Sequence, residues 1–491
     1  MSQYKPDNPN LIYLAQVDFT KDYSHGIHAV LPLGLLAVGT VLQKREFQIR
    51  IVHILENDID CLISELTKNR PLFVGFSVMT GSQTYHSALA SKRIKENLHI
   101  PIVWGGPHPS LLPEQCLSEP YIDFVVIGEG EETIIELTEA ILYGEKDFDN
   151  IKGIGFSLNE KEYKVNEPRS FIKNIDNLTL NYELLDMNQY IFRVGYKNRV
   201  VAYKSSRGCP FNCGFCYNLV FNKRQWRAMS AEAVIEDIEW LKKRYHIDGV
   251  KLYDDEFYIN KERAVQILQK IGIPAHSEIR IDMVDEELAK LWKETNHLEL
   301  LIGIESASNR LLKLINKGYT VETIRKGADL LSRHNIRTTY SAIFGLPTET
   351  PEEFQDTIEL LLDIYQTHKN CGFTVGAYLP YPGTSLYDLA LKLGFQSPET
   401  TEGWGAVDRF RDTFASPFCD IKRVFKIREY FKFLVYHIPV LSRWFEFRLR
   451  SNFYRFSFDI PITEFLASKA IRGEGLIGGA LRKAHTILNL K

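Results

Sequence analysis

The chain has 491 residues with a formal net charge of −3, and it is 45% hydrophobic and 25% charged. This length exceeds what one hydrophobic core serves, so about two to four domains are expected. The composition is that of a globular protein, and the near-balanced charge argues against nucleic-acid binding through a global positive field.

The N-terminal sequence predicts a cytoplasmic protein. The segment MSQYKPDNPNL lacks the basic and then apolar order of a signal peptide. The longest apolar stretch, residues 29–42, contains Pro32 and is too short to cross a bilayer. In a reducing compartment, clustered cysteines bind metal or do redox chemistry more often than they form disulfides.

Five short apolar runs alternate with amphipathic segments in residues 1–145. The runs are NLIYLAQV, FQIRIVHIL, PLFVGFSV, IPIVWGG and IDFVVIG, and helical patterns follow Pro32, Ile59, Ser82, Pro109 and Glu131. Buried parallel strands joined by helices have this pattern. We expect an α/β, doubly wound, Rossmann-like sheet whose ligand crevice lies at the carboxyl ends of its strands.

Three glycine-bearing loops fall at that edge of the predicted sheet. They are GFSVMTGS, WGGPHPS and IGEGEE. Glycine permits a close backbone approach to a large ligand, and helix N-termini offer free N–H donors. The alternative is that the glycines only make tight turns. The candidate ligand-binding residues are Ser77, Thr80, Gly105, Gly106, His108, Gly128, Glu129 and Gly130.

A second alternation of strands and helices follows a segment with weaker patterns. Residues 146–195 predict a linker that contains a hairpin. In residues 196–394 the runs VAYKSS, GVKLYDDEF, PAHSEIRID, LELLIGIES, RTTYSAIFGLP and CGFTVGAYLPYPG are mostly followed by helical patterns. Six such units predict a partial (β/α)6 barrel with its active site at the carboxyl ends of the strands.

Residues 395–491 predict a helical C-terminal domain. Residues 410–458 are dense in aromatic side chains interleaved with Lys and Arg, as in REYFKFLVYHIPVLSRWFEFRLRSNFYRFSF. This character is typical of a membrane-surface or hydrophobic-substrate face. The alternative is an aromatic-rich helical cap with solvated charges.

Three cysteines, Cys209, Cys213 and Cys216, come directly after the first barrel strand, in SSRGCPFNCGFCYN. Structural zinc takes four ligands, usually in two pairs, and no second pair is present. A redox C-x-x-C pair leaves Cys209 unexplained. An iron–sulfur cubane normally takes four thiolates, so three leave one iron open to an exogenous ligand. The remaining cysteines, which we expect to be small core residues, are Cys61, Cys116, Cys371 and Cys419.

The segment RGCPFNCGFCYN resembles the C-x3-C-x-Φ-C signature of the radical S-adenosylmethionine (SAM) superfamily, with Phe215 as the aromatic Φ. The resemblance implies that Cys209, Cys213 and Cys216 hold a [4Fe–4S] cluster and that SAM chelates the open iron. One-electron reduction then cleaves SAM to a 5′-deoxyadenosyl radical, which abstracts a substrate hydrogen. The cofactor carries the radical chemistry, and the protein supplies orientation and exclusion of water.

The resemblance also implies residues that contact SAM. YDDEF ends the second strand, where the family places an acidic partner of the SAM amino group, either Asp255 or Glu256. GIES ends the fourth strand and suggests Glu305. Each carboxylate alone is more often a helix cap or a satisfied surface charge. The implied SAM contacts are Phe215, Tyr217, Asp255, Glu256, Glu305 and, near adenine in IFGLPTET, Gly345, Leu346 and Pro347.

A doubly wound sheet ahead of such a barrel is similar to the cobalamin (B12)-binding class of radical SAM enzymes. The resemblance covers the chain to about residue 394 and implies that the three glycine-bearing loops contact cobalamin. No D-x-H-x-x-G motif occurs in residues 1–145, so we expect cobalamin without a histidine ligand from that motif. His108 lies at the ligand edge, and His86 lies on a predicted helix.

The class implies cobalamin-dependent C-methylation of an unactivated carbon. Alternatives are radical cyclisation, oxidation or C–C bond formation without methyl transfer, and a non-catalytic Fe–S or zinc-binding module. Expected partners are a small-molecule or lipid-like substrate and a one-electron reductant such as flavodoxin or ferredoxin, with no nucleic acid. The aromatic C-terminal domain suggests peripheral contact with the inner face of the membrane.

Overall fold

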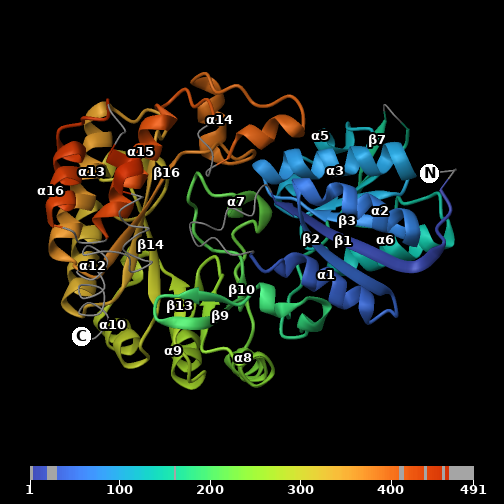
Figure 1. The fold of residues 1–491 in the computed structure, drawn as a ribbon, viewed down its shortest axis with the longest axis horizontal. Helices are drawn as coiled ribbons and strands as arrows, with labels where there is room; N and C mark the ends of the chain where they lie inside the picture. The colour runs from blue at the N-terminus through green and yellow to red at the C-terminus, as the bar shows by residue number, and fades with distance from the viewer. Residues whose placement is uncertain are drawn as a thin grey trace.

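The computed structural model describes residues 4–18, 30–159, 162–408, 414–435, 439–455 and 459–463. Two seven-stranded sheets organise these residues. The first sheet and its helices lie on the right in Figure 1, and the second sheet with the C-terminal helices lies on the left. The fold is α/β with a helical C-terminal part, as the sequence predicts.

The first sheet has the strand order β2-β1-β3-β4-β5-β6-β7, and its first five strands are parallel. One face packs on α2 and α3, and the other packs on α1 and α6, so the sheet is doubly wound. Coverage of both faces explains why strands such as PLFVGFS are apolar without alternation. The five parallel strands are β1 (Asn8–Asp18), β2 (Gln48–Leu55), β3 (Pro71–Ser77), β4 (Ile102–Gly105) and β5 (Phe124–Val126).

The helices of this first unit match the predicted positions. The two on one face are α1 (Leu33–Gln43) and α6 (Glu131–Tyr143), and the two on the other are α2 (Ile59–Asn69) and α3 (Ser82–Leu98). Two short helices, α4 (Pro107–Leu111) and α5 (Pro113–Leu117), follow β4.

Residues 146–195 divide between the two sheets. The hairpin in this segment forms between β6 (Ile154–Ser157) and β7 (Tyr163–Val165), which extend the first sheet in antiparallel fashion. Strand β8 (Phe192–Val194) pairs antiparallel with β9 and forms an edge of the second sheet. The chain therefore crosses from one sheet to the other within this segment.

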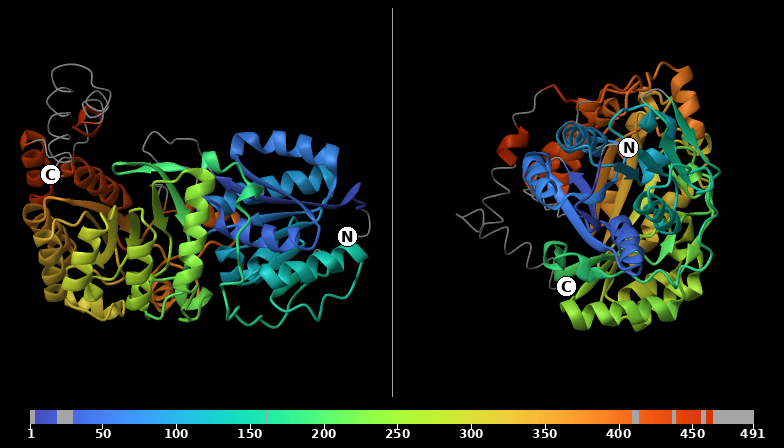
Figure 2. Two further views of the ribbon diagram at one scale, coloured as in Figure 1. Left: turned by 90° about the horizontal axis from the view of Figure 1, so that it is seen from below. Right: turned by 90° about the vertical axis from the view of Figure 1, so that its right-hand side faces the viewer.

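Six parallel strands, with β8 at one edge, make up the second sheet, which forms the predicted partial barrel. The left view of Figure 2 shows this unit beside the unit of the first sheet. They are β9 (Lys197–Tyr203), β12 (Gly249–Leu252), β13 (Ala275–Glu278), β14 (Glu299–Glu305), β15 (Thr338–Phe344) and β16 (Cys371–Ala377). The helices between them are α8 (Ala231–Tyr245), α9 (Lys261–Lys270), α10 (Glu286–Glu294), α11 (Asn309–Leu314), α12 (Val321–Arg333) and α13 (Pro351–Thr367).

Small elements surround the carboxyl end of β9. A two-stranded ribbon joins β10 (Ser206–Arg207) to β11 (Arg227–Ala228), and the cysteine segment runs between β10 and α7 (Asn218–Phe221). After β16 comes α14 (Ser385–Lys392).

The chain after α14 first returns to the first sheet. Trp404 Nε1 donates to Gln115 Oε1 at 2.8 Å, and the backbone N–H of Ser82 donates to Asp408 Oδ2 at 2.8 Å, so residues 398–408 lie against α3 and α5. Helices α15 (Ile421–Leu434) and α16 (Pro439–Arg450) then pack on the barrel, with Phe431 on Phe373 of β16. No helix among the described residues is long and apolar enough to cross a membrane.

Candidate active site

A single glycine sets the path of the cysteine segment. Gly208 has φ +82°, and a Cβ there would lie 2.0 Å from the backbone oxygen of Gln225. Its N–H donates to Asp255 Oδ2 at 2.9 Å. Only glycine combines this left-handed backbone with so close an approach. The turn carries Cys209 away from β10 at the carboxyl end of β9.

The middle of the segment is held by the barrel. The N–H of Gly214 donates to the carbonyl of Ile315 at 2.9 Å, and its own carbonyl accepts from the N–H of Leu386 at 3.0 Å. A further backbone hydrogen bond joins Cys216 to Cys213 at 3.0 Å. Backbone contacts from α11 and α14 therefore shape the segment independently of its side chains.

The three cysteines are partly buried thiols in this segment. Burial raises the pKa of Cys209 to about 11 and that of Cys216 to about 12, although backbone N–H groups of Phe211 and Asn218 favour the thiolates. Such thiols stay protonated near neutral pH unless a cation binds them. This donor set fits an iron–sulfur cluster. The described residues contain no group of three His, Cys, Asp or Glu placed to hold a single metal ion.

The acidic segment after β12 places its two candidate carboxylates differently. Asp255 contacts the cysteine segment through Gly208, and Tyr217 OH donates to its Oδ1 at 3.4 Å. Burial opposes its ionisation, but Lys204 at 3.4 Å and several hydrogen bonds hold the Asp255 pKa below its usual value. We infer that, of the two carboxylates, Asp255 is the better placed to contact a SAM molecule bound at the cluster.

Glu256 supports backbone instead. The two carboxylate oxygens of Glu256 accept hydrogen bonds from the backbone N–H groups of Tyr258 and Arg280, each at 3.2 Å. Glu256 is 3% exposed. Burial raises the Glu256 pKa to about 8. Neighbouring Asp254, also buried, accepts from Ser205 and Ser206 and ties the end of β9 to the end of β12.

Glu305 at the end of β14 pairs with a buried lysine that the sequence did not indicate. Glu305 has φ +61° at an irregularity in the strand, and its Oε1 lies 2.7 Å from Lys317 Nζ, with both side chains under a tenth exposed. Burial works against the charge of Lys317, but Glu305, Tyr319 and Cys213 raise its pKa above the usual value. Its ammonium lies 5.6 Å from the ring of Phe215.

This pair fits recognition of SAM beside the cysteines. A buried ammonium is a counter-charge for a carboxylate, and the facing carboxylate accepts hydrogen bonds from an ammonium or hydroxyl. Lys317 stands in the turn after α11, twelve positions beyond Glu305, and no local pattern marks it. Arg280, also missed, lies two residues after the end of β13. A charged residue near the carboxyl end of a buried barrel strand was a usable signal.

The GLP turn after β15 is buried. Gly345, Leu346 and Pro347 are all buried, and the N–H of Gly345 donates to Glu349 Oε2 at 2.6 Å. A Cβ on Gly345 would lie 2.3 Å from Cys419 Sγ, so the segment ahead of α15 covers one side of this turn. Adenine contact by these residues stays a prediction.

The candidate cobalamin residues gather at the carboxyl edge of the first sheet. Ser77 pairs in register with Gly105, the N–H of His108 donates to the Val78 carbonyl at 3.0 Å, and the N–H of Gly128 donates to Ser110 Oγ at 2.9 Å. A Cβ on Gly128 would meet nothing within 4 Å, so open space lies beside this position of the loop. Gly130 starts α6. These features fit cobalamin.

Two of the candidates have other environments than the sequence suggests. His108 is inaccessible: its Nδ1 lies 3.1 Å from Thr80 Oγ1, its ring lies 6.0 Å from that of Trp404, and Nε2 has no hydrogen-bond partner among the described residues. Burial lowers its pKa to about 3, so the imidazole is neutral. Glu129 is turned toward Arg207 and Arg227, at 2.9 and 2.8 Å.

Burial shows the environment of His86 and tests the expectation that the four remaining cysteines are core residues. His86 is buried in α3 with Nδ1 3.3 Å from Glu56, which makes it a satisfied residue. Cys116 and Cys371 are buried and Cys419 is partly buried, but Cys61 is exposed, so the expectation of a core position is wrong for Cys61. It lies on the outward face of amphipathic α2, where no packing requirement applies.

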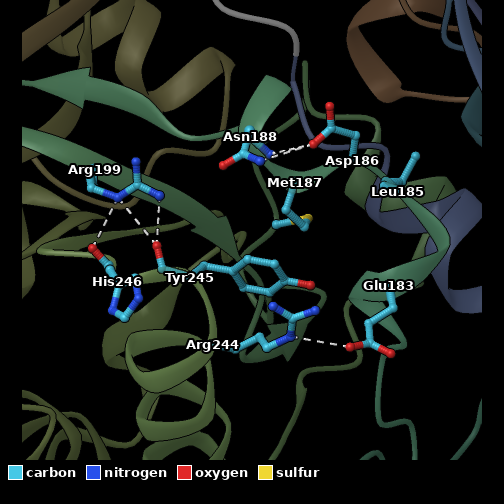
Figure 3. A pocket seen from close by; sticks show the side chains of 9 residues that line it. All are labelled: Glu183, Leu185, Asp186, Met187, Asn188, Arg199, Arg244, Tyr245 and His246. Carbon is cyan, nitrogen blue, oxygen red and sulfur yellow. Dashed lines mark hydrogen bonds and ion pairs between the residues drawn. The ribbon is translucent and has the colours of Figure 1, made fainter.

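An open cavity of about 330 Å³ lies away from the cysteines, where β9 begins and α8 ends (Figure 3). Arg199 donates to the carbonyls of Tyr245 and His246, and Arg244 pairs with Glu183 at 3.3 Å. The Arg199 side chain that lines this cavity thus satisfies carbonyl groups at the C-terminal end of α8. The cavity lies at the amino ends of the barrel strands. In barrels whose active site lies at the carboxyl ends, residues at the amino ends contribute to stability.

The first sheet and the barrel meet at their functional edges. Helix α4, which carries His108, contacts α7, which follows Cys216. Arg207, two residues before Cys209, bridges to Glu129 and to Glu131 Oε1 at 2.5 Å. A doubly wound sheet that faces a three-cysteine barrel edge to edge defines the class of cobalamin-binding radical SAM proteins.

Comparison with known proteins supports this class. Residues 28–138 match the family described as B12 binding domain, and residues 203–361 match the radical SAM superfamily. An uncharacterised methyltransferase of Pyrococcus horikoshii is 36% identical over 376 residues, covering 73% of this chain and 78% of that protein. The chain belongs to the cobalamin-binding radical SAM family. Its two domains imply a [4Fe–4S] cluster, SAM and cobalamin as cofactors.

More distant relatives differ in reaction. An anaerobic magnesium-protoporphyrin IX monomethyl ester cyclase of Rubrivivax gelatinosus is 27% identical over 349 residues, covering 68% of this chain and 62% of that enzyme. Other relatives include further cyclases and several methyltransferases. The structure of the cobalamin-dependent SAM radical enzyme OxsB, with aqua-cobalamin and SAM bound, superposes with a TM-score of 0.65 at 18% identity over 98% of this chain and 76% of that one, which shows the shared fold.

Proposed function

We propose that this protein is a cobalamin-dependent radical SAM methyltransferase that acts on an unactivated carbon. The observation that carries the proposal is the pairing of Arg207 with Glu129 and Glu131. It ties the loop assigned to cobalamin to the segment assigned to the cluster. A methyl donor and a radical generator that serve the same substrate carbon must face one cavity, and this pairing brings their loops together.

The bound cofactors would supply a radical that activates the substrate carbon and a methyl group for transfer to it. Within the chain, Cys209, Cys213 and Cys216 would hold the cluster. Lys317 would bind a carboxylate and Asp255 an amino group of SAM. The buried neighbours of these groups exclude water, which strengthens each charge interaction.

The test is anaerobic turnover of reconstituted protein with SAM carrying a trideuterated methyl group, with and without added hydroxocobalamin. The proposal expects 5′-deoxyadenosine, S-adenosylhomocysteine and cobalamin carrying the labelled methyl group, seen by mass spectrometry. If only 5′-deoxyadenosine forms, with cobalamin present and bound, methyl transfer is refuted and a cyclase-type reaction takes its place. The relationship to the Rubrivivax cyclase favours that second candidate.

For the substrate we propose a lipid-like molecule reached at a membrane surface. The rings of Trp444 and Phe447 of α16 lie 5.9 Å apart, and these residues are 37% and 55% exposed. Ile462, nearby in the chain, is 54% exposed. By spacing, the exposed Arg443 and Arg450 lie on the same helical face as Phe447, although Arg450 also pairs with Glu359. Aromatic and cationic side chains on one helical face favour an anionic lipid surface.

Vesicle co-sedimentation tests this surface. Vesicles of phosphatidylglycerol and phosphatidylcholine are expected to retain the protein at low salt, and the Trp444→Ala/Phe447→Ala double variant is expected to stay in the supernatant. Tyr143→Ala is the control, because Tyr143 is 76% exposed on the first sheet's unit. Equal retention of all three proteins, or of none, would refute the surface.

We also propose a flavodoxin or ferredoxin as the reductant, a cytoplasmic location and no role for nucleic acid. The cluster needs one electron for each SAM cleavage event, and no second cysteine cluster is present among the described residues to store it. Mixing the reconstituted protein with flavodoxin in its hydroquinone form tests the first point, because transfer of one electron to the cluster should make the flavin semiquinone spectrum appear.

A further inference from the structure

Arg280 brings a fixed positive charge to one of the three cysteines. It follows β13 at the carboxyl end of the barrel, and its side chain is 8% exposed. Its Nη1 donates to Cys213 Sγ at 3.8 Å. The backbone N–H of the same residue donates to Glu256, which ties it to the end of β12. Nothing in the family signature accounts for a guanidinium at this thiol.

The guanidinium is held on every side. Asp282 accepts from Nε and Nη2, each at 3.0 Å, and the carbonyl of Lys317 accepts from Nη2. Phe211, from within the cysteine segment, lies under the guanidinium with 3.8 Å between its ring centre and the Arg280 Cζ. Planar stacking and a two-point carboxylate contact fix the orientation of Nη1, because arginine donors are rigidly spaced.

We propose that Arg280 sets the reduction potential of the cluster through its hydrogen bond to the Cys213 sulfur. Reduction adds one electron from the external reductant and moves no proton, so the reduced cluster carries one more negative charge. A charged donor at a ligand sulfur stabilises that form more than the oxidised form. Arg280 thereby makes the cluster easier to reduce.

The charges around Arg280 favour a local effect. Asp282 offsets part of the positive charge and is 27% exposed, whereas Nη1, the nitrogen at Cys213, belongs to the buried side chain. Lys317 is paired with Glu305 and contributes less net charge. An arginine stays protonated at any working pH, so its effect does not titrate. The proposal depends on cluster binding and not on which product the enzyme makes.

Redox titration followed by electron paramagnetic resonance tests the proposal on reconstituted full-length protein. Arg280→Gln is expected to move the potential of the cluster to a more negative value at unchanged iron and sulfide content. Asp282→Asn keeps the guanidinium and removes its counter-charge, so it is expected to move the potential the opposite way. A general loss of structure is not expected to shift the reduction potential in opposite directions in these two variants.

Arg325→Gln is the matched control, because Arg325 forms an exposed pair with Asp363 at 3.1 Å on the outer helices. The reduction potential of the cluster in Arg325→Gln is expected to equal that in the wild type. An Arg280→Gln protein that holds a full cluster at the wild-type potential overturns the proposal. If that variant fails to take up iron, Asp282→Asn decides: a less negative potential supports the role of Arg280, and an unchanged one refutes it.

Discussion

The Glu129 carboxylate lies 2.9 Å from the Arg207 guanidinium, across the junction between the first sheet and the barrel. Glu129 also accepts from Arg227 at 2.8 Å and from the N–H of Ile172 at 2.8 Å, and its side chain is 7% exposed. Nearby cations hold its pKa below the usual value, although burial opposes them. Because Arg207 stands two residues before Cys209, this ion pair links the position of the cysteines to that of the loop assigned to cobalamin.

Removing that carboxylate charge is expected to weaken the junction. Glu129→Gln leaves the largely buried Arg227 without its carboxylate partner and leaves Arg207 with Glu131 alone, so the free energy of unfolding should fall by about 3 kcal/mol. Urea denaturation measures this change, and hydrogen exchange should show faster opening of residues 205–217. Arg325→Gln, in an exposed pair, should cost less than about 1 kcal/mol. Equal losses in the two variants would contradict a special role for Glu129.

Each cysteine of the segment is expected to be necessary for the cluster. Cys209→Ala, Cys213→Ala and Cys216→Ala should each lose iron binding and SAM cleavage, because each removes one of three thiolate ligands. Far-ultraviolet circular dichroism should stay unchanged, since backbone hydrogen bonds of Gly214 hold the segment. Cys61→Ala, at an exposed position, is the control. A single alanine variant with full cluster content would show that its cysteine is not a ligand.

The turn at Gly208 is expected to tolerate no side chain. Gly208→Ala places a methyl group 2.0 Å from the Gln225 carbonyl at φ +82°, so the segment must move and iron content should drop severely. Gly195→Ala separates the two causes, because Gly195 also has positive φ, +56°, but has open space around its Cβ. Gly195→Ala should keep its iron, as measured by metal analysis after anaerobic reconstitution. Similar iron loss in both variants would mean that close approach is not the reason.

Lys317 is expected to contribute to SAM affinity and not to cluster assembly. Lys317→Met removes the buried ammonium next to Phe215 while keeping much of its length. Affinity for SAM, measured by equilibrium dialysis on the reconstituted protein, should fall about tenfold or more, as expected for a lost charge-assisted hydrogen bond. Iron content should match the wild type. Unchanged affinity with a full cluster would remove Lys317 from the SAM site.

His108 is expected to make the first sheet sensitive to acid. Burial lowers its folded pKa to about 3, whereas an unfolded histidine titrates near 6.5, so the unfolded chain binds more protons at acid pH. Its contribution is therefore complete above about pH 6.5 and is lost as the pH falls toward 3. Protonation of His108 in the unfolded chain should lower the free energy of unfolding of the wild type by about 2 kcal/mol between pH 7 and pH 5. Urea denaturation of His108→Gln should show a decline smaller by that amount, and an equal decline would refute the assignment.

Much of the architecture was predictable because its signals are local. The strand and helix positions follow from apolar periodicity and from Gly and Pro, which act within a few residues. The six parallel strands of the barrel all form where the sequence predicts them, and one further strand, β8, joins its edge. The spacing of Cys209, Cys213 and Cys216 within eight residues also depends on no distant part of the chain.

The sequence by itself thus determined the two sheets and the family, and it predicted the cluster ligands. Only the tertiary structure decided that Glu129 meets Arg207 instead of open space, that Lys317 faces Glu305 and that Arg280 reaches Cys213. It also decided that residues 398–408 return to α3. These contacts join residues that lie far apart in the sequence, at the ends of different strands or in separate units. The local periodicity of a sequence does not encode which distant charged side chains will meet.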